Sequence, residues 1–223
     1  MWPTSRNDTH EKVKEALKLI RQGEGQLVEF KNKAKFPEKI IREVVAFANS
    51  YGGHLFIGVN DDGSLAGLKY PEDEEYVLTK AISELCRPAI SFTVDLLQVR
   101  EDIEILHYHI HESKSKPHFA FLDKKHRYGK AFVRSADHSI QASYEVRQIL
   151  KRSKKAHRPI EFEEKTRQLF KYFEDHPGIT LSEYSELSGL NKKLASNKLI
   201  HLALSGALKI EPKEGGDIFL PAE

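Results

Sequence analysis

The spacing of hydrophobic residues alternates between a helical and a strand-like period along the first 150 residues. Hydrophobic residues return every three or four positions after Asp8, again from Pro37 and again over 74–85, which predicts three amphipathic helices. Ser143 caps a further predicted helix that reaches Leu150. Short hydrophobic or alternating runs predict strands at 27–31, 55–59, 91–99, 103–111, 119–122 and 131–134. Together these elements predict an α+β fold whose first part is an α/β sandwich of about 150 residues.

A different pattern occupies the C-terminal part of the chain. Helical periodicity covers 162–173 and 181–188, and a third helix begins after Asn191 and runs to Ser205. Two short strands, 208–210 and 218–220, flank a K-E-G-G-D turn and predict a β-hairpin. Three helices followed by a hairpin within about sixty residues predict a winged helix-turn-helix.

A basic segment separates the two patterns. Residues 147–158 include six Lys or Arg residues and no acidic residue. Such a run is typical of a linker or of an exposed helix end. We therefore predict a first domain over residues 1–150, a basic linker over 151–161 and a winged helix over 162–223.

Composition excludes several classes of protein. The chain has 223 residues, 39% of them hydrophobic and 30% charged, as in ordinary globular proteins. Its single cysteine, Cys86, excludes an internal disulfide and a cysteine-based zinc site. Because no signal-peptide core and no membrane-spanning run occurs, we expect a cytoplasmic protein without a membrane partner. The net charge of +2 means that nucleic-acid binding would rest on local basic patches.

The third helix of the predicted winged helix carries candidate nucleic-acid contacts. The residues spaced to face the core are Leu194, Leu199, Leu202 and Ala203. The residues left outward on the first two turns, where recognition helices reach bases and phosphates, are Lys192, Lys193, Ser196 and Asn197. Lys213 in the wing, with Lys151 and Arg152 in the basic segment, would add phosphate contacts. Winged helices also serve as protein–protein modules, and the mildly acidic second helix keeps that alternative open.

An acidic pair with a lysine marks the beginning of the first domain. Glu24 and Glu29 lie five residues apart, Lys31 follows, and Asp61 lies in a turn after the strand at 55–59. On a strand, Glu29 and Lys31 point to the same face. Carboxylates and a lysine in this arrangement suit metal-assisted attack on a phosphodiester, and they equally suit a surface ion pair on an edge strand.

Two other sets of residues have competing interpretations. His107, His109 and His111 alternate on one strand face, a spacing that suits either zinc or a solvated face. Arg134, at a strand end beside a polar turn, suits either a phosphate or a carboxylate of the chain itself. We expect no metal at the histidines and leave both uses of Arg134 open.

Four separated motifs occur in the order seen in one known family. They are V-E-F-K at 28–31, A-F-A-N-S-Y-G-G-H-L-F-I-G-V-N-D-D-G-S-L-A-G-L at 46–68, K-P-H-F at 116–119 and A-F-V-R-S-A-D-H-S-I-Q-A-S at 131–143. From about Gly23 to Leu150 the chain resembles the AlbA_2 family, which is shared with the Schlafen proteins and was once described as a divergent AAA domain. The resemblance implies a Schlafen-like sheet-and-helix domain, a C-terminal winged helix and a role in DNA binding and transcription regulation.

Some Schlafen-type members are metal-dependent nucleases that cut structured RNA, and the resemblance implies a corresponding carboxylate set. It would consist of Glu24, Glu29 and Asp61, holding Mg²⁺ or Mn²⁺ with help from Lys31. The chain departs from that pattern because Asn60 stands directly after the strand, where nuclease members are expected to place an aspartate. No G-x-x-x-x-G-K-S/T phosphate-binding motif occurs, so ATP binding has no support from the residues.

The sequence therefore favours a nucleic-acid-binding protein, a DNA-binding transcriptional regulator that needs neither catalysis nor a cofactor. Its partner is DNA or RNA, and a homodimer would suit two half-sites. The alternative is a metal-dependent Schlafen-like endoribonuclease that uses the carboxylate cluster with Mg²⁺ or Mn²⁺.

Overall fold

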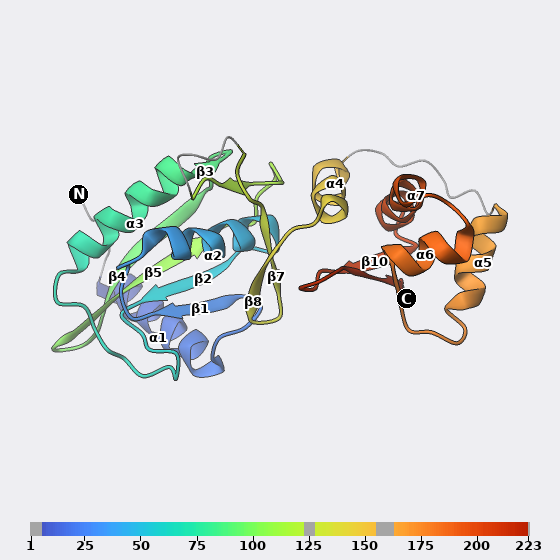
Figure 1. The fold of residues 1–223 in the computed structure, drawn as a ribbon. Helices are drawn as coiled ribbons and strands as arrows, with labels where there is room; N and C mark the ends of the chain where they lie inside the picture. The colour runs from blue at the N-terminus through green and yellow to red at the C-terminus, as the bar shows by residue number, and fades with distance from the viewer. Residues whose placement is uncertain (1–5, 123–127, 155–162, 223) are drawn as a thin grey trace. The chain divides into compact units, whose positions relative to one another are not determined.

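The computed structural model describes residues 6–122, 128–154 and 163–222 of the chain (Figure 1). By its internal contacts the chain divides into two compact units, Met1–Ser139 and Ile140–Glu223. The mixed helices and strands confirm the α+β class expected from the sequence.

A four-stranded sheet forms the centre of the first unit. Its order is β1-β2-β5-β4, with β1 parallel to β2 and the other neighbours antiparallel. The strands are β1 (Val28–Lys31), β2 (Gly53–Ile57), β4 (Phe92–Arg100) and β5 (Ile103–Ile110). The parallel pair is joined by helix α2 (Pro37–Asn49), because parallel neighbours need a crossover connection.

Alternating side chains on these strands give the sheet two hydrophobic faces. Phe30, Phe56 and Ile105 pack on one face with α1 (Arg6–Gln22). The hydrophobic residues that alternate with them along β2 and β5 pack on the other face with α2 and α3 (Pro71–Leu85). Figure 1 shows α2 lying across the sheet. Successive side chains point to opposite faces of the sheet, and helices cover both faces. Few positions on these strands are therefore exposed.

Two short strand pairs lie beside the main sheet. They are β3 (Cys86–Arg87) with β6 (Phe119–Ala120), and β7 (Phe132–Ser135) with β8 (His138–Gln141). The buried side chain of Asn49, at the end of α2, connects the two pairs. Its Nδ2 donates to the carbonyl oxygens of His118 and Phe132, at 3.0 and 2.9 Å, and its Oδ1 accepts from the His118 N–H. One buried amide thus bonds backbone groups of two separate segments.

The described residues of the second unit form four helices and a small sheet. Its elements are α4 (Tyr144–Arg152), α5 (Glu164–Tyr172), β9 (Ile179–Thr180), α6 (Leu181–Ser188), α7 (Lys192–Leu204), β10 (Leu208–Glu211) and β11 (Ile218–Pro221). The strands pair in the order β10-β11-β9, all antiparallel. Leu169, Tyr184, Leu199 and Phe219 form the centre of its core.

The helix ends follow the local signals in the sequence. Thr180 and Glu183 form a reciprocal capping box at the start of α6, and Gly189 ends that helix in a left-handed conformation, with φ of 66°. The Asn191 side chain accepts from the Leu194 N–H at 3.0 Å and caps α7. Ser143 likewise caps α4. These caps confirm the predicted starts of α4, α6 and α7.

Three sequence expectations are wrong in detail. Helix α1 begins at Arg6 instead of after Asp8. The side chain of Leu194, expected in the core, is 51% exposed. The strands β3, β8 and β9 were not predicted, because β3 and β9 have only two residues each and β8 contains a single hydrophobic residue.

The predicted division into domains at residue 150 stays a prediction. By its contacts, α4 groups with the second unit, whose first residue is Ile140. Much of the predicted linker at 151–161 lies outside the described residues, since 155–162 are not among them.

Candidate nucleic-acid interface

The first two turns of α7 present three exposed polar side chains, Lys192, Lys193 and Asn197. In the described part of the chain, neither lysine has a carboxylate partner within salt-bridge distance. Lys198, one turn further along, differs because its Nζ donates to Glu163 at 2.8 Å. The start of α7 thus offers two uncompensated cations near the positive end of the helix dipole.

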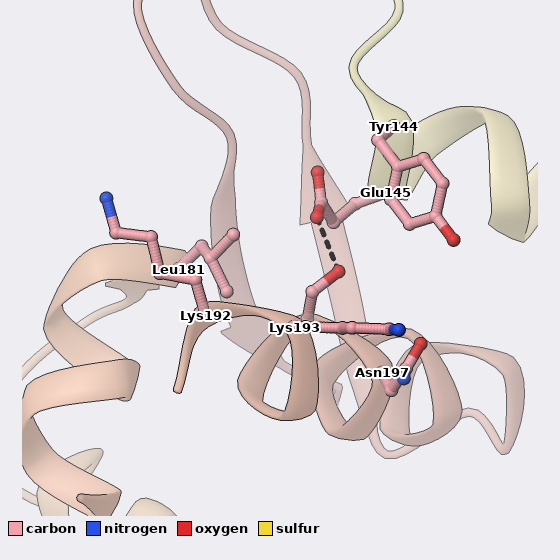
Figure 2. Close-up of a pocket in the computed structure, with 7 residues that line it drawn as sticks. Tyr144, Glu145, Leu181, Lys192, Lys193 and Asn197 are labelled. Carbon is pink, nitrogen blue, oxygen red and sulfur yellow. Dashed lines mark hydrogen bonds between the residues drawn. The ribbon is translucent and has the colours of Figure 1, made fainter. Parts of the chain in front are cut away.

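Helix α4 borders this part of α7 and completes a pocket of about 390 Å³ (Figure 2). The lining residues are Tyr144, Glu145, Leu181, Lys192, Lys193, Ser196 and Asn197. In Figure 2 the Lys193 side chain extends toward Asn197, whereas the Lys192 side chain points to the opposite side. The pocket therefore combines cations, an amide, a phenol ring and one carboxylate.

Ser196 differs from the other three residues predicted to face outward on α7. It is only 5% exposed, and its hydroxyl donates to Glu145 Oε1 at 2.5 Å, the dashed line in Figure 2. Helical spacing placed Ser196 on the side of α7 away from the predicted core, but α4 covers that side. Ser196 holds Glu145 in this arrangement, and its predicted role as a nucleic-acid contact stays a prediction.

A second hydrogen bond connects the N-terminus of α4 to the rest of the second unit. Ser143 Oγ accepts from the Val146 N–H at 3.1 Å and donates to Asp217 Oδ2 at 2.5 Å. Burial raises the pKa of Asp217, the Ser143 hydrogen bond lowers it, and the nearby charge of Glu145 raises it. Sequence reasoning found the Ser143 cap but missed Tyr144 and Glu145, because only the tertiary packing of α4 brings them to α7.

The other predicted basic contacts of the second unit lie on its surface. Lys213 Nζ lies 3.4 Å from Glu211 in the hairpin, with both side chains nearly half exposed. Such a pair contributes little to stability and leaves Lys213 available to a phosphate. Lys151 is exposed and Arg152 half-buried at the C-terminal end of α4.

The carboxylates predicted in the first unit lie within electrostatic reach of one another. Glu24 Oε1 accepts from the Phe30 N–H at 2.8 Å. Burial raises the pKa of Glu24; the charges of Glu29 and Asp61 also raise it, whereas the Phe30 hydrogen bond and Lys31 lower it. Glu29 Oε1 accepts from Lys31 Nζ, so the predicted ion pair along the strand is present.

Arg134 is buried among groups of the chain itself. Its Nη1 donates to Glu29 Oε2 at 3.0 Å and to Glu43 Oε2 at 2.7 Å, and its Nη2 donates to the Gly25 carbonyl at 2.6 Å. Its guanidinium also stacks over the Phe47 ring, 4.8 Å from the centroid. The sequence left Arg134 with either a phosphate or a carboxylate of the chain itself as its partner, and these contacts are with carboxylates of the chain.

As they lie, the carboxylates do not fit a divalent cation. Both oxygens of Glu29 accept from cations, Lys31 and Arg134. Asn60, in the position where an aspartate is expected in nucleases, accepts from Asn32 Nδ2 at 2.6 Å and donates to Ser64. Within residues 6–122, 128–154 and 163–222, no three His, Cys, Asp or Glu residues are grouped to hold a metal. The predicted ligand role of Glu24, Glu29 and Asp61 stays a prediction.

The histidines of β5 stack with a histidine of the neighbouring strand. His54 Nδ1 lies 2.9 Å from His107 Nε2, and the rings of His54 and His109 stack with centroids 4.6 Å apart. Burial lowers the pKa of His107 to about 3 and that of His54 to about 4, and the neighbouring imidazoles add to this effect. These rings pack as neutral aromatic groups on the sheet.

No helix in the described ranges is both long and apolar enough to cross a membrane.

The solved structures that resemble the chain include two distant likenesses. The crystal structure of the DIP2311 protein from Corynebacterium diphtheriae is 17% identical, with a TM-score of 0.43, over 69% of this chain and 30% of that protein. The solution structure of the N-terminal domain of a RecG-related protein from Nitrosomonas europaea is 23% identical, with a TM-score of 0.37, over 52% of this chain and 80% of that domain. With TM-scores below 0.5, neither likeness carries an argument about function.

No curated protein is significantly similar to the chain in sequence. Residues 24–143 match the family described as Schlafen, AlbA_2, and this match spans more than half of the 223 residues. It contains the whole central sheet, the Glu24–Lys31 segment and Arg134. The chain belongs to the Schlafen AlbA_2 family.

Proposed function

We propose that this protein binds nucleic acid through the exposed start of α7 and acts as a DNA-binding transcriptional regulator. Membership of the Schlafen AlbA_2 family points to a nucleic-acid-binding role. The observation that carries the proposal is the pair of uncompensated lysines, Lys192 and Lys193, next to the exposed amide of Asn197. Lysines neutralise phosphates, and an asparagine on the same helix suits the edge of a base.

The second unit has the order of elements that a winged helix requires. Helix α7 follows α6 after a turn at Gly189, and the β10–β11 hairpin comes next. In this arrangement the second helix of the pair is the one that enters the major groove. Lys213 in the hairpin would contact the backbone as a wing does, and a homodimer would place two such helices on two half-sites.

Binding to fluorescent duplex DNA and to hairpin RNA, measured at several salt concentrations, tests the proposal. We expect salt-sensitive binding, because phosphate contacts release counterions. The double variant Lys192→Ala/Lys193→Ala should bind more weakly to every sequence and lower the slope of log K against log salt by about 2. Comparing the two substrates decides between DNA and RNA.

A matched control separates the site from overall charge. Arg167→Ala/Lys171→Ala also removes two cations, both exposed on α5. An equal loss of affinity in both double variants would mean that α7 is not the binding element. Absence of salt-sensitive binding in the wild-type protein would overturn the proposal itself.

The endoribonuclease alternative is tested in the same samples by adding Mn²⁺ and running a denaturing gel. The electrostatic proximity of Glu24, Glu29 and Asp61 is the observation that favours it, although the carboxylates do not fit a cation as they lie. Cleavage of the RNA that requires Mn²⁺ and disappears in Glu29→Ala would support the endoribonuclease function and overturn the regulator function. Intact substrate under the same conditions is the result that we expect.

A further inference from the structure

The pocket between α4 and α7 contains a carboxylate in the middle of the proposed binding surface. Glu145 lines the same pocket as Lys192, Lys193 and Asn197, and no salt bridge neutralises it within the described residues. A carboxylate at this position repels phosphate. A ligand group that contacts Glu145 must therefore be a hydrogen-bond donor.

The geometry holds Glu145 with one oxygen engaged and one available. Oε1 accepts from the buried Ser196 hydroxyl at 2.5 Å, and among residues that the structure describes Oε2 has no hydrogen-bond partner. Glu145 lies in the first turn of α4, and that turn is attached through the Ser143–Asp217 hydrogen bond. Such support fixes the direction in which the second oxygen accepts.

We propose that Glu145 is a specificity-determining residue, which accepts a hydrogen bond from the exocyclic amino group of a cytosine or adenine. This inference rests on the proposed function. In the major groove, only cytosine and adenine present an amino donor, whereas guanine and thymine present acceptors. A carboxylate therefore attracts the first two bases and is repelled by the other two.

The other residues of the pocket suit a base rather than a small ion. The Tyr144 side chain is 50% exposed beside Glu145 and offers an aromatic surface. Asn197 has both a donor and an acceptor for a base edge. Lys192 points to the other side of the pocket in Figure 2, where it would reach a phosphate. Phosphate and base contacts are thus divided between the two sides of one surface.

The test uses the full-length protein and a pool of duplexes with a randomised core. Sequences retained by the wild-type protein are identified, and dissociation constants are then measured for the retained site and for each single base change. We expect one position at which cytosine or adenine is preferred. Glu145→Ala should reduce that preference roughly tenfold and tighten binding to all sequences slightly, because it removes a negative charge.

Two further variants separate direct recognition from a structural role. Ser196→Ala keeps the Glu145 carboxylate but removes the hydrogen bond that fixes its orientation. The base preference should therefore weaken without disappearing. Glu174→Gln removes the same charge from an exposed position after α5 and should leave every preference unchanged. Thermal unfolding of each variant shows whether the fold is retained.

The outcomes distinguish this inference from the proposed function. If the wild-type protein retains no duplex, both are overturned. If it binds but Glu145→Ala keeps the same base preferences, or if no position shows a preference, only this inference is overturned. A uniform loss of affinity together with a lower melting temperature in Glu145→Ala also overturns it, because Glu145 would then only hold α4 on α7.

Discussion

At the scale of single residues, Arg134 is the point where three segments of the first unit meet. Its guanidinium contacts Glu29 of β1, Glu43 of α2 and the Gly25 carbonyl before β1, and its side chain is fully buried. A guanidinium presents its donors in a rigid planar fork, so two of its nitrogens reach acceptors on different sides, whereas the lysine ammonium is a compact charge on a flexible stem. Arg134 therefore fixes β1 relative to α2.

Loss of this cation should destabilise the first unit strongly. Arg134→Met leaves the Glu43 carboxylate without a counter-charge and leaves Glu29 with Lys31 alone, which costs about 3–5 kcal/mol of unfolding free energy. Urea unfolding followed by circular dichroism measures the change. The double variant Arg134→Met/Glu43→Gln should recover part of the loss, because the unpaired charge of Glu43 is then absent.

The same variant decides between the two predicted uses of Arg134. If Arg134→Met keeps its stability but binds nucleic acid more weakly, the arginine contacts phosphate and its internal bonds are incidental. A large loss of stability with an unchanged slope of log K against log salt supports the intramolecular use.

At the scale of elements, β5 carries a titratable stack on one face of the sheet. His107 lies between His54 and the Phe56 ring, with centroids 5.1 and 4.5 Å away. The charged groups facing it are Asp95 of β4, whose charge raises the pKa of His107, and Lys12 of α1, which lowers it. Burial outweighs both and keeps the ring neutral.

The stack makes the first unit sensitive to acid. The pKa of His107 falls from 6.5 in the unfolded chain to about 3 in the folded one, so between these pH values the unfolded state binds more protons. Stability is complete above pH 6.5 and is lost as the pH falls, by at most about 1.4 kcal/mol per pH unit for this histidine. His107→Gln should flatten the dependence of unfolding free energy on pH across this window.

An exposed histidine of β8 supplies the control for that experiment. The side chain of His138 is 77% exposed, so His138→Gln should leave the pH dependence as in the wild-type protein. An identical pH dependence in His107→Gln and the wild type would mean that His107 is not a source of the acid sensitivity.

Elements were predictable from the sequence where local chemistry determines them. Gly189 and the caps Thr180 and Asn191 mark helix ends by hydrogen bonds within a few residues, and the structure has them in place. Long-range contacts were not predictable in this way. The Glu145–Ser196 bond joins positions 51 residues apart, and no periodicity indicates which helix will cover Ser196. The exposure of Leu194, which was expected in the core, has the same reason. Helical spacing does not show where neighbouring helices end and so which positions they leave uncovered.

At the scale of the whole chain, the assignment of α4 decides what a functional C-terminal piece contains. Its contacts with α7 and the Ser143–Asp217 bond place α4 in the second unit. A fragment of residues 140–223 should therefore unfold cooperatively on heating. A fragment of residues 162–223 lacks α4 and should melt at a lower temperature, because Ser196 and its surroundings become exposed.

The expected difference follows from the contacts that the shorter fragment loses. Val146 is 4% exposed, and burying a valine is worth roughly 1.5 kcal/mol. In a domain of this size each 1 kcal/mol shifts the melting temperature by about 4–8 °C. Val146→Ala in the full-length protein should therefore lower the same transition by a few degrees. Equal melting temperatures for the two fragments would show instead that α4 is a linker helix, and Glu145 would then have no fixed position beside α7.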